Sequence, residues 1–183
     1  SPVRWGLLGL LALLSLGACG FQLRGASLGE LNLNYRLAYS GESSPAYTDF
    51  QRILSGTLSR QGMRPGTPAD ITLQISDFVL DTVDGAVDTP LRVAEKVTIA
   101  SMTLRVLDGQ GKVLAAQQQL TKRDVYRIDR SQLLGSHALQ SDRQESVLAE
   151  LSQQVVLVLL IVTRQQNSAV NSASSKESRP LAA

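Results

Sequence analysis

Two spacings of apolar residues mark the first strand and the first helix of the chain. From Leu31 to Ser40 (LNLNYRLAYS) apolar and polar residues alternate, which predicts a half-buried strand. Ser44 then suits an N-cap, Pro45 the first helical position and Gly62 the end of a helix. Between them the apolar residues recur at helical spacing: Tyr47, Phe50, Ile53, Leu54 and Leu58.

Alternation returns after this helix and predicts three more strands. Residues 69–82 (ADITLQISDFVLDT) form the first of them, and residues 83–92 (VDGAVDTPLR) contain the Gly and Pro of a loop. Residues 93–107 and 113–123 predict two long strands. DGQGK, at 108–112, is typical of the turn that joins a hairpin.

The last periodic segment, residues 141–166, predicts a long helix. Ser141 and Gln144 fit a capping box at its start. The run from Val155 to Val162 (VVLVLLIV) is apolar on all sides, and its eight residues are too few to span a membrane. Either both sides of the run are buried within the monomer, or a partner covers the outer side.

This order of elements predicts an α+β fold with two layers. We expect a four-stranded, mostly antiparallel sheet with two helices packed on one face, formed by residues 31–164. Residues 165–183 are small and polar, which predicts a disordered tail.

The first 18 residues have the three-part layout of a secretory signal peptide. Arg4 supplies the basic start, Trp5 to Leu16 the short apolar run, and Gly17 and Ala18 the small residues before a cleavage point. The run is shorter than the roughly 20 residues of a membrane-spanning helix. We therefore expect 1–18 to be removed and 19–30 to be a tether.

Charge and composition argue against nucleic acid binding and against catalysis. The net charge is +2, and loss of the leader, whose only charged residue is Arg4, leaves +1, whereas nucleic acid binding needs a concentrated basic surface. The single histidine, His137, lies in a segment predicted to be irregular. It has no second ligand or base near it in the sequence, so we expect no enzyme, no metal and no cofactor.

Cys19 is the only cysteine and has no partner for an intramolecular disulfide. It is either a spare thiol or a modification site. The residues LGAC at 16–19 resemble the lipobox of bacterial lipoproteins, and this resemblance implies that Cys19 carries acyl chains. Several chains would anchor it firmly, because each buried methylene contributes about 0.8 kcal/mol. By the same resemblance, Gly20 in place of Asp implies the outer membrane, on its periplasmic side.

The opening CGFQLRG, residues 19–25, is similar to the opening of the lipopolysaccharide-assembly lipoprotein family LptE, also called RlpB. The order of elements over 19–164, QLLG at 132–135 and DRQE at 142–145 also resemble that family. The resemblance implies a non-catalytic lipoprotein that plugs the β-barrel LptD, assists the assembly of that barrel and helps deliver lipopolysaccharide to the cell surface. This chain departs from the family at VVLVLLIVTR, where members often carry a charged pattern.

Lipopolysaccharide carries phosphates, so a site for it needs cations near an apolar edge. We expect the cations to gather at one end of the sheet, and the candidates are Arg92, Lys96, Lys122, Arg123, Arg127 and Arg130. The alternative is a scaffolding lipoprotein of the outer membrane that binds a periplasmic protein and makes no contact with lipopolysaccharide.

Overall fold

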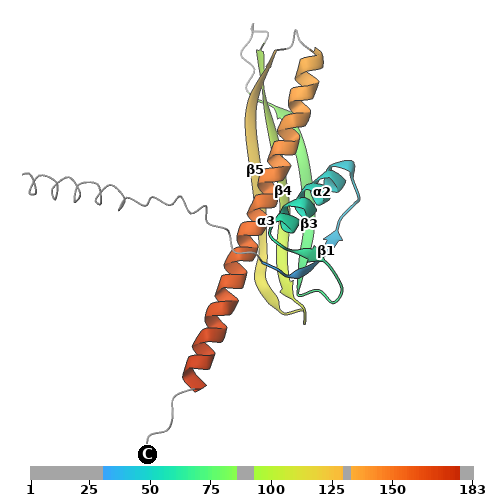
Figure 1. The fold of residues 1–183 in the computed structure, drawn as a ribbon. Coiled ribbons are helices and arrows are strands. Elements are labelled where there is room, and N and C mark those ends of the chain that lie inside the picture. The colour runs from blue at the N-terminus through green and yellow to red at the C-terminus, as the bar shows by residue number, and fades with distance from the viewer. Residues whose placement is uncertain (1–30, 86–92, 130–132, 178–183) are drawn as a thin grey trace, which may run out of the picture.

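The computed structural model describes residues 31–85, 93–129 and 133–177. Figure 1 shows a long twisted sheet with two helices on one of its faces. The elements in chain order are β1 (Asn34–Ser40), α2 (Pro45–Arg60), β2 (Arg64–Pro65), β3 (Ile71–Asp84), β4 (Val93–Asp108), β5 (Val113–Asp129) and α3 (Leu133–Glu177).

The sheet has five strands in the order β2-β1-β3-β4-β5. β1 runs parallel to β3, because α2 carries the chain back before the next strand begins. The longer pairings, β3 with β4 and β4 with β5, are antiparallel. The predicted two-layer α+β fold is therefore confirmed. The additional strand, β2, has only two residues, which is too short to leave a periodic signal in the sequence.

Helix α2 begins and ends where the local sequence indicates. The Ser44 hydroxyl oxygen accepts a hydrogen bond from the Tyr47 backbone N–H at 3.1 Å, and Pro45 opens the helix. Gly62, just beyond the last turn, has φ = +78°, a conformation that glycine adopts without strain. The apolar side of α2 can therefore pack on the sheet over its full length.

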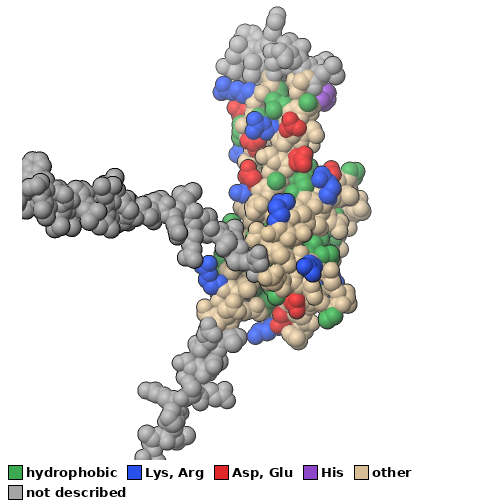
Figure 2. Space-filling view, viewed as in Figure 1, with side chains coloured by type: hydrophobic (Ala, Val, Ile, Leu, Met, Phe, Trp, Pro, Cys, Tyr) green, Lys and Arg blue, Asp and Glu red, His purple; other side chains and the backbone are tan. Residues whose placement is uncertain are grey.

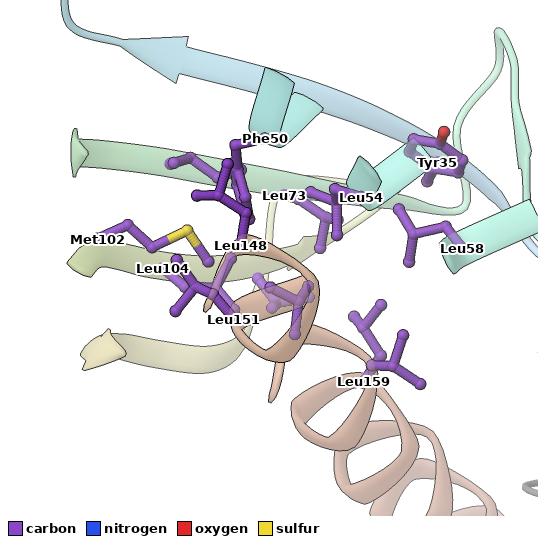
Figure 3. Packing of buried hydrophobic residues seen from close by; sticks show 14 of the residues in the cluster. Tyr35, Phe50, Leu54, Leu58, Leu73, Met102, Leu104, Leu148, Leu151 and Leu159 are labelled. Carbon is purple, nitrogen blue, oxygen red and sulfur yellow. The ribbon is translucent and has the colours of Figure 1, made fainter. Parts of the chain in front are cut away.

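The hydrophobic core lies between the sheet and the two helices. Figure 3 shows side chains from all three parts converging there. Leu54 of α2, Leu73 and Leu104 of the sheet, and Leu151 and Leu159 of α3 are at most 1% exposed. Both helices cover the same face, and none of the described helices lies on the opposite face of the sheet.

The apolar run in α3 is divided between core and surface. Val155, Val156, Leu159 and Val162 are buried against the rest of the monomer. Leu157 and Ile161 are 51% and 58% exposed. Burial within the monomer thus accounts for the first group, while the second group is exposed and a partner for it stays a prediction. By length and composition residues 135–169 could cross a membrane, but much of this segment is packed in the core.

Both predicted ends of α3 differ from the structure. The helix begins at Leu133, so Ser141 lies inside it and the predicted capping box is wrong. Residues 135–146 are polar and largely exposed, and they carry no apolar period that could have marked a helix. At the other end the helix continues to Glu177, so 165–177 are helical where we expected disorder. The last residues, 178–183, lie outside the described part.

We expect Leu151→Ala to lower the free energy of unfolding by about 2–5 kcal/mol, because it leaves a cavity in the core. Leu157→Ala removes the same atoms from the same helix at a half-exposed position and should cost less than about 1 kcal/mol. Urea unfolding followed by circular dichroism measures both. Equal losses would contradict the packing described for α3.

Candidate functional site

Three strands form the far end of the sheet, at the top of Figure 1, beyond the residues that pair with β1. In this region Lys96 pairs with Tyr126 and Arg123 pairs with Ile99, so the predicted cations do share one end. Successive residues of a strand, however, point to opposite faces. Lys122 and Arg123 therefore lie on different faces, and the expected single cluster is divided. We call the two faces the helix face and the open face.

Lys96 and Lys122 lie on the helix face, and each has an acidic neighbour. The Lys96 ammonium forms an ion pair with Asp84 on β3. The Lys122 Nζ lies 3.9 Å from a carboxylate oxygen of Glu150 on α3. Both lysine side chains are more than half buried, so their charges are largely neutralised inside the protein.

These lysines belong to a wider set of polar contacts between α3 and the far end of the sheet. Arg143 of α3 reaches Asp124 of β5 at 3.4 Å, and the Gln144 amide donates to the Thr82 hydroxyl at 3.2 Å. The Thr82 and fully buried Thr98 hydroxyls are 2.9 Å apart. We call these contacts, with the two lysine pairs, the polar seam. Figure 2 shows basic and acidic side chains interspersed on this side of the molecule.

The open face at the far end combines an apolar row with two arginines. Val83, Val97 and Val125 are directly opposite one another on β3, β4 and β5. Val97 is buried, while Val83 and Val125 are 42% and 47% exposed. Arg123 and Arg127, two residues to either side of Val125, flank this row on the same face.

The charges of these two arginines are less compensated than those of the lysines. Neither guanidinium forms an ion pair or hydrogen bond with another described residue. Arg123 has Ile99 as its neighbour on β4, and Arg127 has Glu95. This part of the open face therefore offers an anion two exposed donors beside an apolar surface.

A polar hollow lies further along the open face, where β1 joins the sheet. Its volume is about 270 Å³, and its polar lining includes Ser40, Gln74, Ser76, Thr103, Arg105 and Gln117. A second hollow of about 240 Å³ contains Arg36 beside the turn at Gly109. These side chains can donate hydrogen bonds to hydroxyl and anionic groups.

Arg36 and Arg105 were not among the predicted site residues. Both are the polar members of an alternating strand, so they could have been assigned to the exposed face. Their places in the two hollows could not be predicted, because these depend on β1 pairing in parallel with β3, next to β4. Three predicted residues, Cys19, Arg92 and Arg130, lie outside the described residues.

The described residues contain no group of three or more metal-ligating side chains. His137, expected in an irregular segment, lies on the exposed side of α3. Burial raises the pKa of the Tyr47 hydroxyl, and the Tyr39 ring stacked on it at 3.6 Å adds to the rise. Tyr47 lies in the core beside Phe50 and Phe78, so this shift reflects packing. The open face offers guanidinium, amide and hydroxyl donors beside apolar side chains.

The two adjacent residues of β5 should respond differently to the same charge reversal. Lys122→Glu would place a second carboxylate beside Glu150, and we expect it to lower the free energy of unfolding by about 1 kcal/mol. Arg123→Glu on the open face should change it by less than about 0.5 kcal/mol. Urea unfolding of both variants measures this difference. A larger loss for Arg123→Glu would contradict the assignment of faces.

The fold is similar to that of several solved lipoproteins. A minor lipoprotein of Acinetobacter baumannii matches 70% of this chain and 90% of its own, with a TM-score of 0.54 and 18% identity. Lipoprotein B of Nitrosomonas europaea matches 87% and 97%, with a TM-score of 0.55 and 18% identity. Rare lipoprotein B of Shewanella oneidensis matches 74% and 98%, with a TM-score of 0.50 and 12% identity.

Sequence comparison adds no relative to these structures. No family model matches the chain, and no curated protein matches it. The described domain therefore has the fold of rare lipoprotein B, the fold that the opening CGFQLRG had implied.

Proposed function

We propose that this protein is a non-catalytic outer-membrane lipoprotein that binds lipopolysaccharide and acts as the plug and assembly factor of an LptD-type β-barrel. The observation that carries the proposal is the open face, where Arg123 and Arg127 flank the valine row. This arrangement fits an amphiphile that has phosphates next to acyl chains.

The two arginines suit the phosphates of lipid A. A guanidinium group can bind a phosphate through two parallel hydrogen bonds, and such charge-assisted bonds are among the strongest in proteins. The neighbouring valines offer acyl chains a surface that is already half exposed. Lys122 supports this site indirectly, since its ion pair with Glu150 holds β5 against α3, and Lys96 joins β4 to β3 through Asp84. Arg92 and Arg130 remain candidates from the sequence.

The barrel partner is supported by the resemblance of CGFQLRG to the LptE family and by the shared fold. The surface is also suitable for a barrel interior. Gln119, Thr121 and Arg123 form an exposed polar row along β5, and interiors of large outer-membrane barrels are polar. A barrel of more than twenty strands has a lumen wide enough to hold a plug.

The anchor is proposed to be Cys19, acylated after removal of residues 1–18. The described domain begins at Leu31, so eleven residues, 20–30, separate it from the anchor. Fully extended, these residues span at most about 40 Å. The domain would therefore stay near the periplasmic surface of the outer membrane. The Acinetobacter, Nitrosomonas and Shewanella proteins with this fold are themselves lipoproteins.

Reversing the two open-face charges should weaken binding of lipopolysaccharide. We expect Arg123→Glu with Arg127→Glu to raise the Kd at least about tenfold, because two charge-assisted contacts become repulsive. Arg64→Glu with Lys112→Glu makes the same change in net charge at exposed positions distant from the valine row and should leave the Kd nearly unchanged. Titration of the purified chain with lipopolysaccharide, with circular dichroism to verify folding, measures both. Equal effects would refute the site.

Copurification tests the partner. When the tagged chain is extracted from outer membranes in mild detergent, we expect a stoichiometric β-barrel of the LptD type to accompany it. Depletion of the chain should then reduce lipopolysaccharide at the cell surface and leave the barrel misassembled. Recovery of the chain alone or with periplasmic proteins only, and with surface lipopolysaccharide unchanged, would instead support the scaffolding alternative.

A further inference from the structure

The outer edge of β5 is long and has no neighbouring strand in the described part of the chain. β5 is the last strand of the sheet and has 17 residues, whereas the strand at the other edge, β2, has two. No backbone hydrogen bond joins this edge to another described segment. Soluble proteins usually shorten, distort or cover such edges, because the alternating N–H and C=O groups are a template for another strand.

The part of this edge that is suitable for pairing is regular. From Gln118 to Asp129 every residue of β5 pairs in register with β4, from Leu104 to Val93. The irregular pairing is confined to the other end, between Val113 and Gln118. The bulge that would hinder an added strand therefore leaves twelve consecutive residues undisturbed.

One side of α3 faces this edge. Spacings of 7, 4, 3 and 4 residues place Arg143, Glu150, Gln154, Leu157 and Ile161 on one stripe of the helix. The first two contact Asp124 and Lys122 of β5, which fixes the direction of the stripe. Figure 1 shows α3 running in front of β5 and past the lower part of the sheet.

The stripe contains groups that the other described residues leave exposed or without a hydrogen-bond partner. Leu157 and Ile161 are the two exposed large apolar side chains of α3 among the residues described. The side-chain carbonyl oxygen of Gln154, between them and the ion pairs, is shielded from solvent and has no hydrogen-bond partner. A buried acceptor without a donor is rare in a complete structure. Another chain could cover Leu157 and Ile161 with apolar side chains and donate a hydrogen bond to the Gln154 oxygen.

Charge on the other face restricts what can occupy the edge. Arg123 and Arg127 project there, and a two-fold pairing of β5 with a second copy about Val125 would set Arg123 against Arg127 of the other copy. Like charges directly opposite each other destabilise a sheet. The arginines thus disfavour this pairing of two copies and favour a strand with carboxylates four residues apart.

We propose that the edge from Gln118 to Asp129, together with the α3 stripe, is a docking site for an extended segment of another protein. The segment adds to the sheet as a sixth strand. Its aliphatic side chains lie under Leu157 and Ile161, and its acidic side chains lie beside Arg123 and Arg127. This inference does not rest on lipopolysaccharide binding, although both ligands would use the same arginines.

The site is tested on the full chain with a twelve-residue peptide of alternating valine and threonine. Glutamate replaces two of its threonines, four residues apart. Binding should slow hydrogen exchange of every second amide between Gln118 and Asp129, as measured by NMR. A peptide with lysines in place of the glutamates should bind about tenfold more weakly.

The helix stripe is tested by Leu157→Gln with Ile161→Gln, which should weaken binding of the peptide about tenfold and leave lipopolysaccharide binding unchanged. Val79→Gln with Val83→Gln changes two similarly exposed apolar residues away from the edge and should not weaken peptide binding. Failure of the peptide to protect alternate β5 amides would overturn the proposal. Equal peptide binding by the α3 variant and the control variant would also overturn it. So would β5 edge amides that are protected from exchange without peptide and lose this protection when residues 1–30 are deleted.

Discussion

Burial of one side of α3 against the sheet is the constraint on which the rest of the structure depends. Leu151, Val155 and Leu159 are almost completely buried, and each such side chain contributes roughly 1.5–3 kcal/mol. α2, with 16 residues, does not cover the long strands by itself. Its neighbour in the chain, β1, pairs with only the first six residues of β3. α3 therefore defines the second layer, and no described helix lies on the opposite face of the sheet.

This division into layers determines the environment of each charge. Lys122 and Arg123 are adjacent in the sequence, yet the lysine lies under α3 beside Glu150 and the arginine faces away from it. Charges beneath the helix are balanced by acids on α3 and β3. Charges on the uncovered face are available to a ligand. A polar face with two arginines and a valine row is therefore a consequence of packing both helices on one side.

The sequence was sufficient to predict α2 and the β4–β5 hairpin, since Ser44, Pro45 and the DGQGK turn are local signals. It was not sufficient for the start of α3, because 135–146 has no apolar stripe and is held by polar contacts. The four predicted cations that the structure describes, Lys96, Lys122, Arg123 and Arg127, lie at one end of the sheet. Their separation onto two faces depends on the pairing of Arg123 with Ile99, and the hollow at Arg105 depends on the parallel pairing of β1 with β3.

The polar seam gives the molecule two zones of unequal local stability. Near α2 the layers are joined by apolar burial, which is lost only when the whole domain unfolds. At the far end they are joined by the Lys122–Glu150 and Arg143–Asp124 ion pairs and by the hydrogen bond from Gln144 to Thr82, each worth about 1 kcal/mol or less. The first turns of α3 can therefore separate from the sheet in a subglobal opening while the core remains intact. The domain thus combines a rigid part near α2 with a far end that can open locally.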